Sequence, residues 1–196
     1  MADATKPDIL IFCNGAVDGG LKKMKEKANV HQASFGVPGD TSSLLHQLSR
    51  QVVEYVKNRG GIVIVGGFFS LTIRPSELNR WLRHSWGMPW RSGQYGRTTV
   101  LLQDSHVGLE ASTRAHLVAS YSSKALFLKN VSSSDSLYAS PKGARSESIV
   151  FGPVPIEAQT VIAFGKCGQG WLGFTGDTHN VDGTAEALLA MMGLLA

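Results

Sequence analysis

The stretch "VVEYVKNRGGIVIVGGFFS", residues 52–70, joins the end of an amphipathic helix to a buried strand. We predict that the helix begins at one of the N-capping residues 40–42 and ends at Gly60, with basic side chains in its last turn. Its apolar residues recur at helical spacing: Leu44, Leu45, Leu48, Val52, Tyr55 and Val56. The branched residues at 62–65 predict the strand. A helix, a short loop and a buried strand are typical of a parallel βαβ repeat.

Further elements are predicted on both sides of this unit. Apolar runs indicate strands at 8–13, 98–103 and 123–130, with a short strand as one option at 29–35. Helical spacing indicates helices at 75–86 and 183–195. The strands at 160–164 and 170–174 are separated by five residues, so we expect them to be antiparallel neighbours. The serine-rich segment 132–148 is predicted to be an exposed loop.

The composition indicates one globular α/β domain over residues 1–196, because 43% of the residues are hydrophobic and 17% are charged. No run is long enough to cross a membrane, and the first residues do not resemble a signal peptide. Two distant cysteines, Cys13 and Cys167, fit neither a disulfide framework nor a zinc site, so we expect a reducing, cytoplasmic setting. The formal charge of +4 is scattered, which argues against a nucleic-acid partner.

The glycine-rich run "FGKCGQGWLGF", residues 164–174, contains Cys167. A nucleophile elbow needs glycines two residues either side of the nucleophile and a following helix, whereas here Gln169 and a strand follow. A phosphate loop needs Gly-Lys-Ser/Thr before a helix, which is missing as well. We therefore interpret the run as a hairpin turn whose cysteine is incidental.

A strand-to-helix turn occurs at "IVIVGGFFSLTIRPSEL", residues 62–78. The strand ends at Gly66 and Gly67, and a helix is expected to begin between Ser70 and Pro75. Ligands of parallel α/β sheets bind at the carboxyl ends of the strands, so we expect a site here. The alternative is that the two glycines only permit a close turn.

The segments 52–70 and 161–194 together resemble the class I glutamine amidotransferase-like superfamily, and within it the trehalose-utilisation (ThuA-like) proteins. The stretch 66–99 is similar to an uncharacterised fungal branch of that group. The resemblance implies a flavodoxin-like three-layer sandwich with a mostly parallel sheet and a late antiparallel hairpin. It also implies that "VGGFFS" lies at the superfamily's nucleophile elbow.

The sequence departs from the amidotransferase pattern at both catalytic positions. The elbow contains no cysteine, and the late strand is followed by Asp177 and His179 instead of a His-x-Glu pair. These departures argue against glutamine hydrolysis. Ser70, His179 and Asp177 could instead form a serine hydrolase triad, because a hydroxyl needs an imidazole base and a carboxylate that orients it. Serine and aspartate in loops are, however, common turn and cap residues.

Two functions are therefore open. The first is a small-molecule, carbohydrate-related binding or hydrolytic protein, with no metal and no cofactor. Its predicted ligand-binding residues are Cys13, Asn14, Gly66, Gly67, Phe68, Trp90 and Arg97. The second is a non-catalytic scaffold domain that forms a homodimer through the aromatic and arginine-rich segment 80–97, since tryptophan, tyrosine and arginine are enriched at interfaces.

Overall fold

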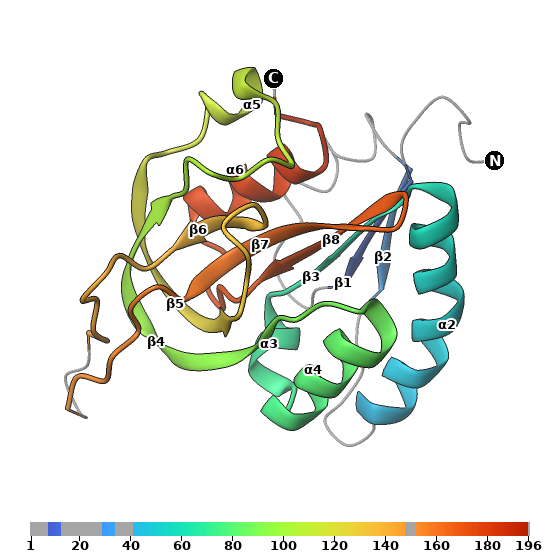
Figure 1. Ribbon diagram of the computed structural model, residues 1–196, viewed down its shortest axis with the longest axis horizontal. Helices are drawn as coiled ribbons and strands as arrows, with labels where there is room; N and C mark the ends of the chain where they lie inside the picture. Colours follow the sequence, from blue (N-terminus) through green and yellow to red (C-terminus); the bar gives the residue numbers. More distant parts are fainter. Residues whose placement is uncertain (1–7, 13–28, 34–40, 148–151, 196) are drawn as a thin grey trace.

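The computed structural model describes residues 8–12, 29–33, 41–147 and 152–195. Cys13 and Asn14 lie outside these ranges. The described strands form one eight-stranded sheet with the order β2-β1-β3-β8-β7-β5-β4-β6 (Figure 1). Its two halves differ in strand direction.

The first half of the sheet is parallel and contains the predicted βαβ unit. Its strands, in sheet order, are β2 (Asn29–Ala33), β1 (Asp8–Phe12), β3 (Ile62–Val65) and β8 (Gly170–Thr175). Helix α2 (Thr41–Arg59) comes between β2 and β3 in the chain, close to its predicted bounds. The strands expected near residues 8 and 29 are also confirmed.

Helices cover both faces of this parallel half (Figure 1). The helices concerned are α2, α4 (Pro75–Trp81) and α6 (Asp182–Met191). Val56 of α2 packs in one core cluster with Val63 of β3 and Leu78 of α4, whereas Ile64 packs in the opposite cluster with Leu188 of α6. Because neighbouring residues of β3 point to opposite faces, a run of branched apolar residues is buried on both sides.

The second half of the sheet is antiparallel, and it closes on itself. Its strands are β4 (Arg91–Leu102), β5 (Ser120–Lys129), β6 (Ser136–Ala139) and β7 (Thr160–Cys167). Strand β7 pairs with β5, β5 with β4, β4 with β6, and β6 with β7 again. These four pairings make a closed four-stranded antiparallel barrel, and β7 joins it to β8 through the expected hairpin.

The prediction of a flavodoxin-like, mostly parallel sheet is therefore wrong. Parallel neighbours need a crossover of a dozen or more residues, usually a helix. Among the described residues between β4 and β7, the one helix is the four-residue α5 (Ala111–Arg114), so successive strands turn back on one another. The segment 132–148 is also not the simple exposed loop expected from its composition. It contains β6, whose four residues are all buried.

One further property concerns membranes. In the described part of the chain, no helix is both long enough and apolar enough to span a bilayer.

Candidate functional site

The elbow predicted at "VGGFFS" is present in the backbone. Strand β3 passes through Gly66 and Gly67 directly into the short helix α3 (Phe68–Thr72), so this helix begins earlier than expected. Gly67 has φ 61° and ψ −128°, which residues with a side chain adopt only under strain. A Cβ on Gly66 would lie 2.1 Å from Cγ2 of Thr175. The turn therefore requires both glycines.

The elbow presents no nucleophile at its strained position, because that position is Gly67. Ser70 lies one turn further on and is buried, at 4% exposure. Its hydroxyl donates to the carbonyl oxygen of Thr175 at 2.9 Å, across 105 residues of sequence. The Ser70 side chain thus ties helix α3 to the end of β8.

Asp177 is almost fully buried, at 1% exposure, and its carboxylate binds backbone groups. Its Oδ1 accepts a hydrogen bond from the N–H of His179 at 3.0 Å, and its Oδ2 accepts one from the N–H of Val181 at 2.9 Å. The imidazole of His179 is exposed and lies 3.0 Å from the hydroxyl of Thr178, measured from Nδ1. The carboxylate thus organises the turn that leads into α6.

The three predicted catalytic residues come from elements near the carboxyl ends of β3 and β8. Within the described ranges, no hydrogen bond joins any two of the side chains of Ser70, Asp177 and His179. The side chains of Ser70 and Asp177 instead bond to backbone groups, and the imidazole of His179 lies beside the hydroxyl of Thr178. The triad stays a prediction, and catalytic assays must test it.

Cys167 lies at the end of β7 in the hairpin with β8, as interpreted from the sequence. It is buried, and its Sγ donates to the carbonyl oxygen of Trp86 at 3.5 Å. Burial raises the pKa of the thiol, against a smaller opposing effect of Lys57. Since the thiolate is the reactive form, this environment suppresses nucleophilic chemistry.

The aromatic residues of segment 80–97 are largely internal. Trp81, Trp86 and Trp90 are buried within the chain, and the ring of Trp81 lies 5.8 Å from Phe69 and 5.6 Å from Trp86 between centroids. These tryptophans therefore form a cap over the sheet, packed with the core of the same chain. Homodimerisation through this segment stays a prediction.

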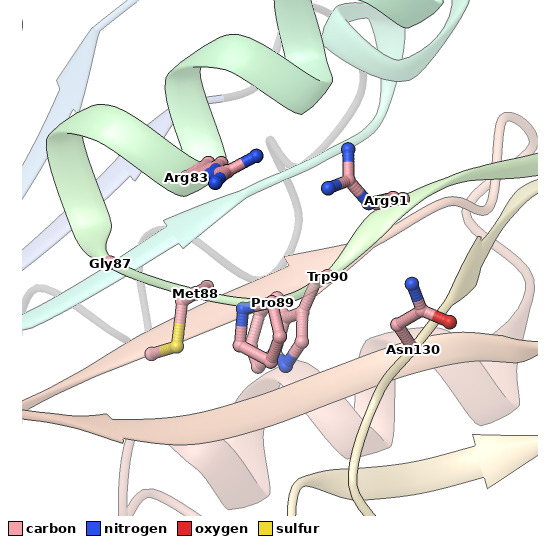
Figure 2. Close-up of a pocket in the computed structure, with 7 residues that line it drawn as sticks. All are labelled: Arg83, Gly87, Met88, Pro89, Trp90, Arg91 and Asn130. Atoms are coloured by element: carbon pink, nitrogen blue, oxygen red, sulfur yellow. The ribbon is translucent and has the colours of Figure 1, made fainter.

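A pocket lies beside this cap, with a volume of about 370 Å³ (Figure 2). It is lined by Arg83, Gly87, Met88, Pro89, Trp90, Arg91 and Asn130. Of the residues predicted to bind a ligand, Trp90 lines this pocket. Arg97 is placed further along β4, where its Nη1 lies 3.4 Å from the hydroxyl of Ser122.

The pocket wall begins with an irregular helical turn. Helix α4 continues into the π-helix η1 (Leu82–Trp86), which ends at Gly87 with φ 74° and ψ 17°. The N–H of Gly87 donates to the carbonyl of Arg83 at 3.2 Å, and that of Met88 donates to Leu82 at 2.9 Å. Single π-turns of this kind are frequent at functional sites.

Among the described residues, no Asp or Glu forms an ion pair within 4 Å with Arg83 or Arg91 of the pocket. Arg91 lies directly opposite Lys129 across the β4–β5 ladder, and Arg83 is exposed on η1. The ion pair that the described residues do form joins Arg114 to Asp104, and neither residue lines the pocket. Like charges on opposite positions of a ladder destabilise it.

Sequence reasoning noted the arginines of segment 80–97 but did not select Arg83, Arg91 or Asn130 as site residues. Asn130 has φ 58°, in the left-handed region. The sequence signal that could have found this wall is Gly87 after a helical pattern, followed by Pro89 before a strand.

A second buried polar group, His106, lies elsewhere. His106 Nε2 is 3.1 Å from the carbonyl oxygen of Phe164, and its Nδ1 accepts the N–H of Gly108 at 3.2 Å. Because Nδ1 is an acceptor, Nε2 carries the proton and the ring is neutral. Burial lowers the pKa of His106. Within the described ranges, no three His, Cys, Asp or Glu residues gather into a possible metal site.

Comparison with known proteins identifies solved structures whose fold is similar to that of this chain. No family model and no curated protein sequence matches the chain. Among solved structures, the cytoplasmic protein STM1381 from Salmonella typhimurium LT2 is similar, with a TM-score of 0.55 and 10% identity. That likeness covers 96% of this chain and 99% of the other.

A β-galactosidase from Bacillus circulans sp. alkalophilus is also similar, with a TM-score of 0.51 and 13% identity. The likeness covers 96% of this chain but 30% of the galactosidase, so this chain corresponds to about a third of that enzyme. At such low identity these similarities describe the fold and leave the function open.

Proposed function

We propose that this chain is a ThuA-like domain of the class I amidotransferase-like type that binds a small molecule without hydrolysing it. The observation that carries the proposal is Gly67 at the strained position of the elbow. In an active elbow that position holds the nucleophile, exposed on a sharp turn between strand and helix. A glycine there can keep the turn but cannot attack a carbonyl.

The neighbouring polar groups support the same proposal. Nucleophilic catalysis by a serine needs a base that takes the hydroxyl proton. The hydroxyl of Ser70 instead donates to a carbonyl oxygen, and the carboxylate of Asp177 accepts two backbone N–H groups. The thiol of Cys167 is buried and has a raised pKa. None of these three groups is activated in the described arrangement.

The pocket beside Trp90 supports a binding function. Its volume of about 370 Å³ falls in the range of roughly 300–1,000 Å³ found for small-molecule sites. Apolar side chains, arginines and one amide line it together. The resemblance to trehalose-utilisation proteins makes carbohydrates a class of ligand to screen.

The test is a hydrolysis screen with glutamine, p-nitrophenyl acetate and p-nitrophenyl glycosides. We expect no turnover above that of a Ser70→Ala variant. Because Ser70 supports the fold, His179→Ala serves as a second variant, since its side chain is exposed and its loss leaves the core intact. Turnover that disappears in both variants would establish a triad and contradict the proposal.

A further inference from the structure

The pocket next to Trp90 carries cationic groups whose charge the described residues do not neutralise. Arg83 and Arg91 line it, and Lys129 lies across the ladder from Arg91. Figure 2 shows the guanidinium groups of Arg83 and Arg91 on the same side of the chain segment 87–90. Arginine guanidinium groups match the planar and bidentate geometry of carboxylate and phosphate oxygens.

The backbone that presents Arg91 is held in place on both sides. The indole N–H of Trp90 donates to Oδ2 of Asp135 at 3.4 Å, and the N–H of Ser92 donates to Oδ1 of Asn79 at 2.7 Å. Arg91 lies between these two anchored residues. Because the frame is fixed before a ligand arrives, less ordering entropy is lost on binding.

Asn130 adds a polar group with an unusual backbone. It follows β5 directly, its side chain lines the pocket, and its φ of 58° lies in the left-handed region. Asparagine tolerates this region better than most residues, and such outliers cluster at ligand sites. Its amide can donate to an oxyanion or bond to a hydroxyl group.

The remaining wall is apolar and the volume exceeds the needs of an inorganic anion. Met88 and Pro89 line the pocket beside the arginines. The volume of about 370 Å³ leaves room for an uncharged body beside an anionic group. This combination separates a small organic anion from free phosphate or sulfate.

We infer that this pocket binds the phosphate monoester of a small polar molecule, with Arg83 and Arg91 pairing the phosphate and Asn130 contacting the ligand body. The inference rests on the proposed function, since it names the ligand class of the same site. Asp135 is an acid next to the wall, because its Oδ2 accepts the indole N–H of Trp90. The net charge of the named groups stays positive.

The inference is tested by isothermal titration calorimetry with glucose 6-phosphate, inorganic phosphate, glucose and a short RNA oligonucleotide. We expect glucose 6-phosphate to bind more tightly than inorganic phosphate, and glucose to give no measurable heat. Because the pairs are ionic, affinity falls as sodium chloride is raised.

Variants locate the site. Arg83→Gln and Arg91→Gln are each expected to weaken binding of glucose 6-phosphate about 10- to 100-fold, the effect of losing a charged hydrogen bond. Arg80→Gln is the matched control, because Arg80 is exposed on α4 in the same segment but does not line the pocket. Circular dichroism of each variant checks that it is folded.

Four outcomes would overturn the inference: no heat with glucose 6-phosphate, equal binding of glucose, an equal loss in Arg80→Gln, or binding of RNA alone. Phosphate release measured in the same samples tests the proposed function separately. If binding depends on Arg83 and Arg91 and phosphate is then released, the inferred ligand class stands. The proposal that the protein does not hydrolyse its ligand would then be wrong.

Discussion

Replacing Asp177 by alanine should destabilise the protein far more than replacing an exposed aspartate nearby. The buried carboxylate accepts two backbone hydrogen bonds, from His179 at 3.0 Å and Val181 at 2.9 Å. Hydrogen bonds to a charged group contribute about 1.5–3 kcal/mol each, so the pair sets an upper limit of about 6 kcal/mol. Water can reach the N–H groups of these partly exposed residues, so we expect a loss of about 2–4 kcal/mol.

The assay is urea unfolding followed by tryptophan fluorescence. With an m-value of about 2–3 kcal/mol/M, the expected loss lowers the midpoint by about 1 M urea. Asp182→Ala is the matched control, because Asp182 is exposed in the first turn of α6 and contributes less than about 1 kcal/mol there. If the two variants unfold at the same midpoint, the structural role assigned to Asp177 is refuted.

Three further predictions concern single positions. Gly67→Ala should cost about 1–3 kcal/mol of unfolding free energy because of its backbone angles, whereas Gly152→Ala, at an open position, should cost little. The lowered pKa of His106 predicts that its contribution to stability is complete above pH 6.5 and falls as the pH drops toward the folded-state pKa, by at most about 1.4 kcal/mol per pH unit. Urea unfolding at several pH values measures this dependence. It should be weaker in a His106→Gln variant. In a Cys13→Ser variant, Cys167 should react with a thiol reagent at least about 10-fold faster in urea than when folded.

Elements with strong local signals were predictable from the sequence. The capping residues and apolar spacing of 40–60 predicted a helix that the structure confirms as Thr41–Arg59. The five-residue connection after residue 164 likewise predicted the β7–β8 hairpin. In both cases the determining interactions lie within a few residues of one another.

The candidate site was only partly predictable. The run of two glycines after a buried strand located the elbow, because few other residues permit such a turn. The sequence left open whether Ser70 and Asp177 are catalysts or structural residues, since the same residue types serve in both roles. The pocket was missed because Gly87 precedes β4 and Asn130 follows β5, and only the pairing of these two strands brings them together.

By itself, then, the sequence determined the parallel βαβ unit, the late hairpin and the absence of a cysteine at the elbow. Tertiary structure decided that β6 closes a barrel against β4 and β7 and that the hydroxyl of Ser70 meets Thr175 across 105 residues. The physical reason is the range of the interactions. Capping and periodicity act within one or two turns, whereas strand closure depends on pairings between distant segments that no local pattern encodes.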